Sequence, residues 1–391
     1  MYSFSWNAQS LTKGYWNASL QLNDSTTLDF QLEVIKKKRE TIFKIHNASE
    51  VIVLKNKKWS KDTIQLEFPN FQSELLFKVT SNQSVQGSWM NYNKGKNYYI
   101  PFQAQYFSKQ LPKNTHPEEN TKWEVLFAPQ QKGQFPAVGL FKQKGNDIEG
   151  TFLTETGDFR FLQGKIHGEQ FTLACLDGSH AFLFKGTLND SSCTGNFYSG
   201  NHYATSFSGI KNEHASLKDP ETITYQKENE TLKFSLNDLK GNAFSYPNEQ
   251  LKGKVVIIQI MGTWCPNCLD ETKFFKSLYE KYHDKGLEII SIGYEVGQNE
   301  AEYAAKINIL KERLQLDFTF LIGGNATKSL ASKHFESLNE IISFPTAIFV
   351  NKAGAIERIH TGFNGPSTGV YYDEYVLKTT ALIESMLGIN K

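Results

Sequence analysis

The stretch KVVIIQIMGTWCPNC, residues 254–268, decides the fold of the C-terminal part of the chain. It begins with a short aliphatic run, which is typical of a buried strand, and ends in two cysteines. Downstream, Phe275, Leu278 and Tyr282 recur at the spacing of one helical face, and Gly286 ends that pattern. The order of strand, cysteine pair and helix predicts that both thiols lie at the N-terminus of the helix.

The positions of Cys265 and Cys268 predict their chemistry. Unpaired backbone N–H groups and the positive end of the helix dipole stabilise a thiolate at a helix N-terminus. The Cys-x-x-Cys spacing also allows the second thiol to reach the first. We therefore expect Cys265 to attack a disulfide, and Cys268, one turn into the helix, to resolve the mixed disulfide that results.

The rest of the C-terminal part alternates strands with helices, which is typical of a mixed α/β sheet. We place this domain at residues 231–391. Amphipathic patterns predict helices near residues 303–314 and 375–387. Apolar runs predict further strands at 287–294, 317–322, 346–351 and 355–360.

Residues 1–212 carry the pattern of antiparallel β structure, since runs such as TTLDFQLEVI at 26–35 alternate apolar and polar side chains. This part of the chain also repeats itself. Three pairs of similar motifs lie 107, 107 and 108 residues apart, namely WNASLQL at 16 and WEVLFAP at 123, LLFKVT at 75 and FLFKGT at 182, and GSWMNY at 87 and GNFYSG at 195. We expect two related β modules, residues 1–112 and 113–212, each a barrel or a sandwich.

A polar stretch follows the modules, and we interpret residues 213–230 as a linker. The chain of 391 residues is nearly neutral, with 42 Lys and Arg against 41 Asp and Glu, so we expect no nucleic-acid partner. No run approaches the roughly 18 apolar residues of a membrane span, and the opening residues lack the features of a secretory signal. We expect any signal or membrane anchor to belong to a longer precursor.

Three motifs occur in an order that resembles a known family. FSLNDLKGNAFSYPNEQLKGKVV at 234–256 resembles its leading hairpin and first core strand, GTWCPNC at 262–268 its active site, and SFPTAIFVNKAGAIERIHTGF at 343–363 its proline loop and last hairpin. From about residue 232 onward, the chain is similar to the TlpA/ResA-like family of membrane-tethered bacterial thiol:disulfide oxidoreductases. The resemblance implies a thioredoxin-like fold for this domain, and it does not extend to the β modules.

The resemblance also implies a substrate site around the cysteines. It places Phe344, Pro345 and Thr346 in a cis-proline segment whose backbone pairs with an extended substrate, with Trp264 and Pro266 on the same surface. The implied activity is reduction of disulfides in envelope proteins by dithiol exchange, at a periplasmic or envelope-facing location. The implied partners are disulfide-containing proteins and a thiol electron donor. The cysteine pair is the redox group, with no metal or organic cofactor.

Two positions depart from the family pattern. A buried strand residue that is aspartate in thioredoxins is Gln259 here, so an acid at that position is not available to take a proton from the resolving thiol. We nominate Glu271, which matches a glutamate that the family often carries, for proton transfer instead. Lys273 replaces a common proline, a change that concerns helix shape more than chemistry.

The cysteines also allow other interpretations. A zinc site would need two more ligands, but Cys175 and Cys193 lie in another domain, two strands apart, where we expect buried or surface free thiols. A redoxin-type thiol peroxidase with an antioxidant role is the alternative enzyme, although Thr263, Trp264 and Cys265 lack the PxxxTxxC pattern of peroxiredoxins. Reductases and oxidases share the same residues, so the direction of electron transfer stays open.

The β modules carry no recognisable catalytic constellation. We interpret them as a platform that binds a partner or as a spacer, and both interpretations stay open. Trp16, Trp89 and Trp123 are candidates for a binding face. Aromatic residues that recur in strands are more often core, which is our expectation here.

Overall fold

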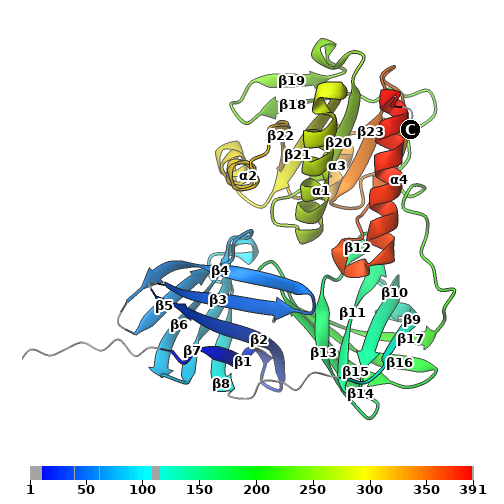
Figure 1. The fold of residues 1–391 in the computed structure, drawn as a ribbon. Helices are drawn as coiled ribbons and strands as arrows, with labels where there is room; N and C mark the ends of the chain where they lie inside the picture. The colour runs from blue at the N-terminus through cyan, green and yellow to red at the C-terminus, as the bar shows by residue number, and fades with distance from the viewer. Residues whose placement is uncertain (1–10, 39, 61, 108–114, 390–391) are drawn as a thin grey trace, which may run out of the picture. The chain divides into compact units, whose positions relative to one another are not determined.

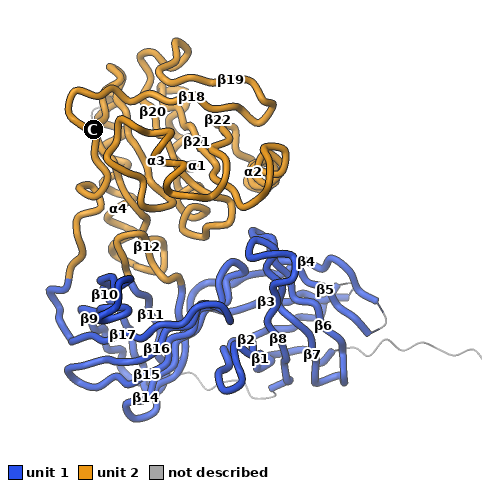
Figure 2. The backbone as a smooth tube through the Cα atoms, turned by 180° about the vertical axis from the view of Figure 1, so that it is seen from behind, with its two compact units in different colours: residues 1–152, 161–215 blue, residues 153–160, 216–391 orange. Residues whose placement is uncertain are grey.

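The computed structural model describes residues 11–38, 40–60, 62–107 and 115–389, and its elements are shown in Figure 1. The chain divides into two compact units, coloured separately in Figure 2. Unit 1 consists of Met1–Phe152 and Phe161–Ala215, and unit 2 consists of Leu153–Arg160 and Ser216–Lys391.

The first β module is a closed barrel of eight strands, in which each strand pairs with the next and β1 also pairs with β8. Alternate side chains face the interior, and Trp16 and Trp89 are 1% and 0% exposed, which confirms that they are core residues. The strands are β1 (Gly14–Asn23), β2 (Thr26–Lys37), β3 (Glu40–Asn47), β4 (Glu50–Trp59), β5 (Thr63–Glu67), β6 (Ser73–Ser81), β7 (Ser84–Asn91) and β8 (Tyr99–Phe107).

The second β module is a nine-stranded sheet that also closes, because β10 pairs with both β9 and β11 and β17 pairs with β9. Trp123 lies in its core at 2% exposed. The two predicted β modules are confirmed as barrels, while the expected boundary at 112/113 lies outside the described residues. The strands are β9 (Glu118–Phe127), β10 (Phe135–Lys144), β11 (Asp147–Thr154), β12 (Gly157–Asp158), β13 (Leu162–His167), β14 (Gln170–Leu176), β15 (Ala181–Leu188), β16 (Ser192–Ser199) and β17 (Tyr203–Lys211).

The two barrels follow the same strand order, and only β12 in the second has no counterpart in the first. Cys175 in β14 and Cys193 in β16 are buried and outside any disulfide, with β15 between them, as expected. Burial raises the pKa of Cys193 to about 12, so this thiol stays protonated at neutral pH. These cysteines are therefore packing residues of the second barrel.

Unit 2 is built on a seven-stranded sheet in the order β19-β18-β22-β21-β20-β23-β24, which confirms the thioredoxin-like fold. Every residue of β20 is buried, as expected for a central strand covered on both faces. No helix among the described residues is long and apolar enough to span a membrane. The elements are β18 (Phe234–Asp238), β19 (Ala243–Tyr246), β20 (Val255–Met261), α1 (Pro266–Tyr282), β21 (Leu287–Glu295), α2 (Glu300–Leu314), β22 (Thr319–Asn325), α3 (Lys328–His334), β23 (Thr346–Val350), β24 (Ile356–Thr361) and α4 (Val370–Leu387).

The expected linker is a packed part of unit 2 from Ser216 onward. Thr224 is fully buried, and its hydroxyl donates to the carbonyl of Glu340 over 3.1 Å. Gln226 forms a β-bridge with Leu338. The interpretation of residues 216–230 as a linker is therefore wrong, because the buried side chains of Ile223 and Thr224 and a β-bridge hold this polar stretch in unit 2.

A second difference concerns residues 153–160, which were expected to belong only to the second β module. Strand β12 pairs with the end of β11 through Leu153 opposite Asp158 and Thr154 opposite Gly157. This small hairpin packs with unit 2, as its colour in Figure 2 shows. We call it the 153–160 hairpin.

Candidate functional site

The two cysteines lie where β20 passes into helix α1. Cys265 is the N-cap residue of the helix, and its Sγ accepts the backbone N–H of Cys268 over 3.3 Å. Pro266 occupies the first turn, where its missing N–H costs no helical hydrogen bond. Cys265 is 8% exposed and Cys268 is fully buried. The sulfur expected to attack is thus the outer one, and it faces a helical N–H donor.

The predicted proline loop lies beside Cys265. The Phe344–Pro345 peptide bond is cis, and the thiol of Cys265 donates to the carbonyl of Phe344 over 3.5 Å. The Thr346 hydroxyl donates to the carbonyl of Ser343, which holds the turn. The indole of Trp264 meets the Phe344 ring edge-on at 6.1 Å. The structure therefore brings together, beside Cys265, the residues that we predicted for the substrate site.

Glu271 lies fully buried in the first turns of α1. Gln259 donates to one carboxylate oxygen over 2.9 Å, and the Tyr375 hydroxyl donates to the other over 3.0 Å. Burial raises the pKa of Glu271 to about 7, although both hydrogen bonds oppose the rise. A carboxyl group that titrates near neutrality can exchange a proton at physiological pH.

The resolving thiol shares this environment. Burial raises the pKa of Cys268 well above its usual value, and the neighbouring Cys265 and the charge of Glu271 raise it further. Gln259 connects the two groups, because its amide also approaches the carbonyl of Cys268 at 3.5 Å. A thiol held protonated in this way must lose its proton before it can attack a disulfide. The buried carboxyl of Glu271 lies near enough to raise the pKa of this thiol.

Glu295, at the end of β21, was not identified from the sequence. It accepts the backbone N–H of Thr263 over 2.8 Å and the Thr263 hydroxyl over 2.6 Å. Burial raises the pKa of Glu295 to about 7. The residue thereby fixes the loop that leads into Cys265. A charged residue ending the apolar run LEIISIGYE was the available signal.

The 153–160 hairpin supplies polar groups beside the cysteine pair that the sequence analysis did not predict. Arg160 forms an ion pair with Asp270 of α1 at 2.5 Å, and both side chains are almost fully buried. Lys273, which was expected to concern helix shape, donates to the same carboxylate over 3.0 Å. A buried pair of this kind contributes to stability only when its remaining polar atoms are also satisfied.

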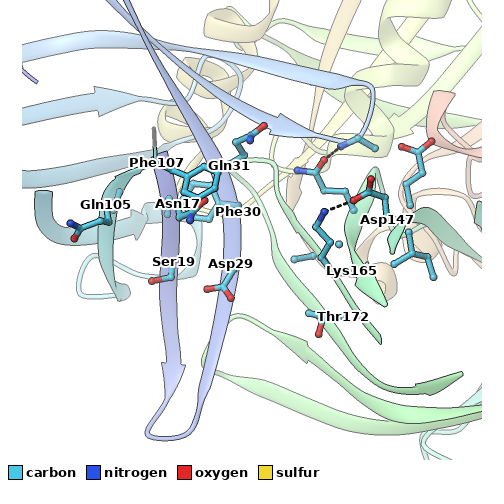
Figure 3. Close-up of a pocket in the computed structure, with 18 of the residues that line it drawn as sticks. Asn17, Ser19, Asp29, Phe30, Gln31, Gln105, Phe107, Asp147, Lys165 and Thr172 are labelled. Carbon is cyan, nitrogen blue, oxygen red and sulfur yellow. Dashed lines mark hydrogen bonds and ion pairs between the residues drawn. The ribbon is translucent and has the colours of Figure 1, made fainter. Parts of the chain in front are cut away.

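Unit 1 contains a cavity of about 1120 Å³, part of which is shown in Figure 3. Asn17 and Asp29 line it from the first barrel, and Thr172 lines it from the second. Lys165 and Asp147 also face this space and form an ion pair with each other. The cavity is a feature of unit 1, whereas the cysteine pair belongs to unit 2.

Comparison with known proteins addresses the C-terminal part of the chain. The family profile described as Redoxin matches residues 226–374. The thiol-disulfide oxidoreductase ResA of Bacillus cereus (strain ZK / E33L) is 31% identical over 153 residues, which cover 39% of this chain and 77% of the relative. ResA of Halalkalibacterium halodurans is 30% identical over 138 residues, covering 34% of this chain and 67% of the relative. A thioredoxin-family thiol:disulfide interchange protein from Chlorobium tepidum TLS has a TM-score of 0.30, with 15% identity and coverage of 44% of this chain and 99% of its own.

The matched residues contain the cysteine pair, the proline loop and Glu271. The resemblance inferred from the sequence motifs is thus confirmed for this part of the molecule. The enzyme acts on disulfides, and the chain belongs to the family of ResA-like thiol-disulfide oxidoreductases.

Proposed function

We propose that this protein reduces disulfides in exported proteins by dithiol exchange through Cys265 and Cys268. The observation that carries the proposal is the placement of Cys265 Sγ between a helical N–H donor and the backbone of the cis-proline loop. The first contact favours a thiolate, and the second lies where an extended substrate would pair. Phe344, Pro345 and Thr346 would bind the substrate backbone, while Trp264 and Pro266 would line its path.

The exchange proceeds in two steps that balance. The Cys265 thiolate attacks one sulfur of the substrate disulfide, forms a mixed disulfide and releases the other substrate sulfur as a thiolate. Cys268 then loses its proton to the Glu271 carboxylate and attacks Cys265 Sγ. The second substrate sulfur leaves, and a Cys265–Cys268 disulfide remains. The substrate gains two electrons and takes up two protons, and the protein is oxidised by the same two electrons.

The thiol pair carries both electrons, so the proposed reaction needs no metal or organic cofactor. An external thiol must reduce the Cys265–Cys268 disulfide before the next turnover. We place the protein in the periplasm or cell envelope, because protein disulfides form and persist in oxidising compartments. The β modules would bind the partner protein or act as a spacer.

The direction of transfer is tested by the equilibrium reduction potential of the cysteine pair, titrated against dithiothreitol or glutathione. A value near about −270 mV, as in thioredoxin, supports a reductase, whereas a value near about −120 mV, as in DsbA, would make the protein an oxidant. Cys268→Ser should trap a mixed disulfide on Cys265, and Cys265→Ser should not. Peroxide turnover by Cys268→Ser would instead support the thiol peroxidase alternative.

The role of Glu271 is tested by the pH dependence of the resolving step. Glu271 must be ionised to accept a proton, so the rate should rise with pH through about 7, the value to which burial raises its pKa. We expect Glu271→Gln to slow this step by roughly 100-fold at pH 7, the lower range for a general base. Glu280→Gln, on the exposed face of the same helix, is the control. An unchanged pH profile in Glu271→Gln would refute the role.

A further inference from the structure

The 153–160 hairpin contacts three other segments of unit 2, two of which lie beside Cys265. The Ser343 hydroxyl, next to the cis-proline loop, donates to the carbonyl of Thr156 over 3.0 Å. The carboxylate of Asp158 accepts the backbone N–H of Gly365 over 2.6 Å and the Ser367 hydroxyl over 2.8 Å, both in the segment before α4. The hairpin thus joins the proline loop to the segment that follows β24.

The third segment is the cysteine motif itself. The amide of Asn267, between the two cysteines, donates to the carbonyl of Asp158 over 3.2 Å and to that of Phe363 over 3.3 Å. Its side-chain oxygen accepts from Arg160 over 3.3 Å. Arg160 also forms the buried ion pair with Asp270. The second of the two residues between the cysteines is therefore held by the hairpin at both polar atoms of its side chain.

Two glycines allow the backbones to approach this closely. A Cβ on Gly157, which has φ +133°, would lie 2.4 Å from Nδ2 of Asn267. A Cβ on Gly362, which has φ +75°, would lie 2.9 Å from the carbonyl oxygen of Glu155. Both positions require glycine for conformation as well as for space. One glycine lies in the hairpin and the other in the segment after β24, so a side chain at either position would prevent the close contact between them and the active-site motif.

The hairpin contacts the residue that precedes Phe344, where we propose that the substrate backbone pairs. It pairs with Ser343, while the backbone N–H of Phe344 makes no hydrogen bond within the described residues of unit 2. The Gly362 N–H donates to the carbonyl of Pro345, which fixes the other side of the loop. An extended chain could therefore pair at Phe344 with the hairpin alongside it.

We propose that the 153–160 hairpin is a wall of the substrate site and determines which protein disulfides reach Cys265. This inference rests on the proposed function. The wall leaves room for a disulfide carried on an extended segment at Phe344 and holds off disulfides on bulky folded surfaces. Specificity then depends on residues 153–160 of unit 2, which precede the thioredoxin-like sequence in the chain.

The experiment measures the rate at which the reduced full-length chain is oxidised by two probes, glutathione disulfide and native insulin. Gly157→Ala and Asp158→Ala each displace or release the hairpin, the first by collision with Asn267 and the second by loss of its hydrogen bonds. Gly168→Ala is the matched control, since Gly168 also has a positive φ of +59° in the second barrel but has open space around it. The reduction potential of each variant is measured alongside.

We expect the ratio of the insulin rate to the glutathione disulfide rate to rise about tenfold in both variants, the lower range for removing a steric exclusion, with an unchanged reduction potential. Gly168→Ala should keep the parental ratio. An unchanged ratio of the two rates in Asp158→Ala would overturn the proposal that the hairpin limits access to Cys265. Equal changes in the rates of both probes, together with a shifted reduction potential, would also overturn it. A wild-type chain that reacts with neither probe would overturn the proposed function itself.

Discussion

The two barrels use the same connection, between their third and fourth strands, in different ways. β3 begins at Glu40 and β11 at Asp147, an offset of 107 residues that matches the sequence repeat. In the first barrel a tight turn joins β3 to β4, with Asn47 opposite Glu50. In the second barrel the connection opens into the 153–160 hairpin before β13 begins.

Each connection contacts the next part of the chain. The Asn47 side chain in the first barrel forms two hydrogen bonds with the backbone of Leu176 in β14 of the second barrel. Its amide nitrogen donates to the Leu176 carbonyl over 3.1 Å, and its oxygen accepts from the Leu176 N–H over 3.2 Å. The 153–160 hairpin, which belongs to unit 2, contacts the rest of that unit through Arg160 and Asp158. The comparison teaches that one position of a repeated module carries different contacts in its two copies. We call the amide contact of Asn47 with Leu176 the neutral junction, and the buried ion pair of Arg160 with Asp270, within unit 2, the charged junction.

The largest expected effect comes from breaking the charged junction. Arg160→Met leaves the buried Asp270 with only Lys273 as a cation, which should destabilise unit 2 by about 3 kcal/mol. Hydrogen exchange of the β20 amides measures this free energy. The double variant with Asp270→Asn should recover part of the loss. The matched control is Lys165→Met, because its ion pair with Asp147 is half exposed and is worth about 0–1 kcal/mol.

A smaller effect is expected at the neutral junction. Asn47→Ala leaves the N–H and carbonyl of the buried Leu176 without their partner, at a cost of about 1–3 kcal/mol. Exchange of the β14 amides reports this loss. Asn56→Ala, on the exposed face of β4, should change stability by less than about 0.5 kcal/mol. A loss at Asn47 equal to that at Arg160 would remove the distinction between the junctions.

The smallest effect is a difference in acid sensitivity. Burial raises the pKa of Asp270, but Arg160 and Lys273 outweigh it and hold the pKa below its usual value. This stabilisation is therefore present above the unfolded-state pKa, near 3.8, and is lost as pH falls through the folded-state value. The charged junction should weaken below about pH 4 while the neutral one does not. Parallel acid titrations of wild type and the Arg160→Met, Asp270→Asn variant, followed by exchange at β20 and β14, test this.

Short sequence motifs predicted the cysteine pair, the proline loop and the fold class of each domain. A Cys-x-x-Cys pair after an aliphatic strand, followed by a proline loop, carries its chemistry within short segments. The repeated motifs likewise predicted two β modules, because each half preserves the spacing of its strands. Glu271 was also named in advance, because it matches a glutamate that the resembled family often carries.

The surroundings of the site depended on contacts that no local pattern records. Arg160 lies 110 residues before Asp270 in the chain and follows a turn-like ETGD segment, so nothing nearby indicates a buried ion pair. Nothing near Gly157 in the sequence indicates its close approach to Asn267, which leaves no room for a Cβ at position 157. The composition of residues 216–230 is polar, yet Ile223 and Thr224 are buried and Gln226 forms a β-bridge with Leu338. These contacts join segments more than 100 residues apart in the chain, so the composition of the stretch does not indicate them.

The position of the hairpin in the chain also orders events during synthesis. Arg160 leaves the ribosome 110 residues before Asp270, a delay of roughly 5–20 s at ordinary translation rates. Throughout this interval the guanidinium has no Asp270 carboxylate to meet, so the hairpin cannot yet take its final place. The hairpin can therefore reach its final conformation only after the beginning of α1 has been synthesised. Newly made chains stalled before residue 270 should expose this hairpin to proteases.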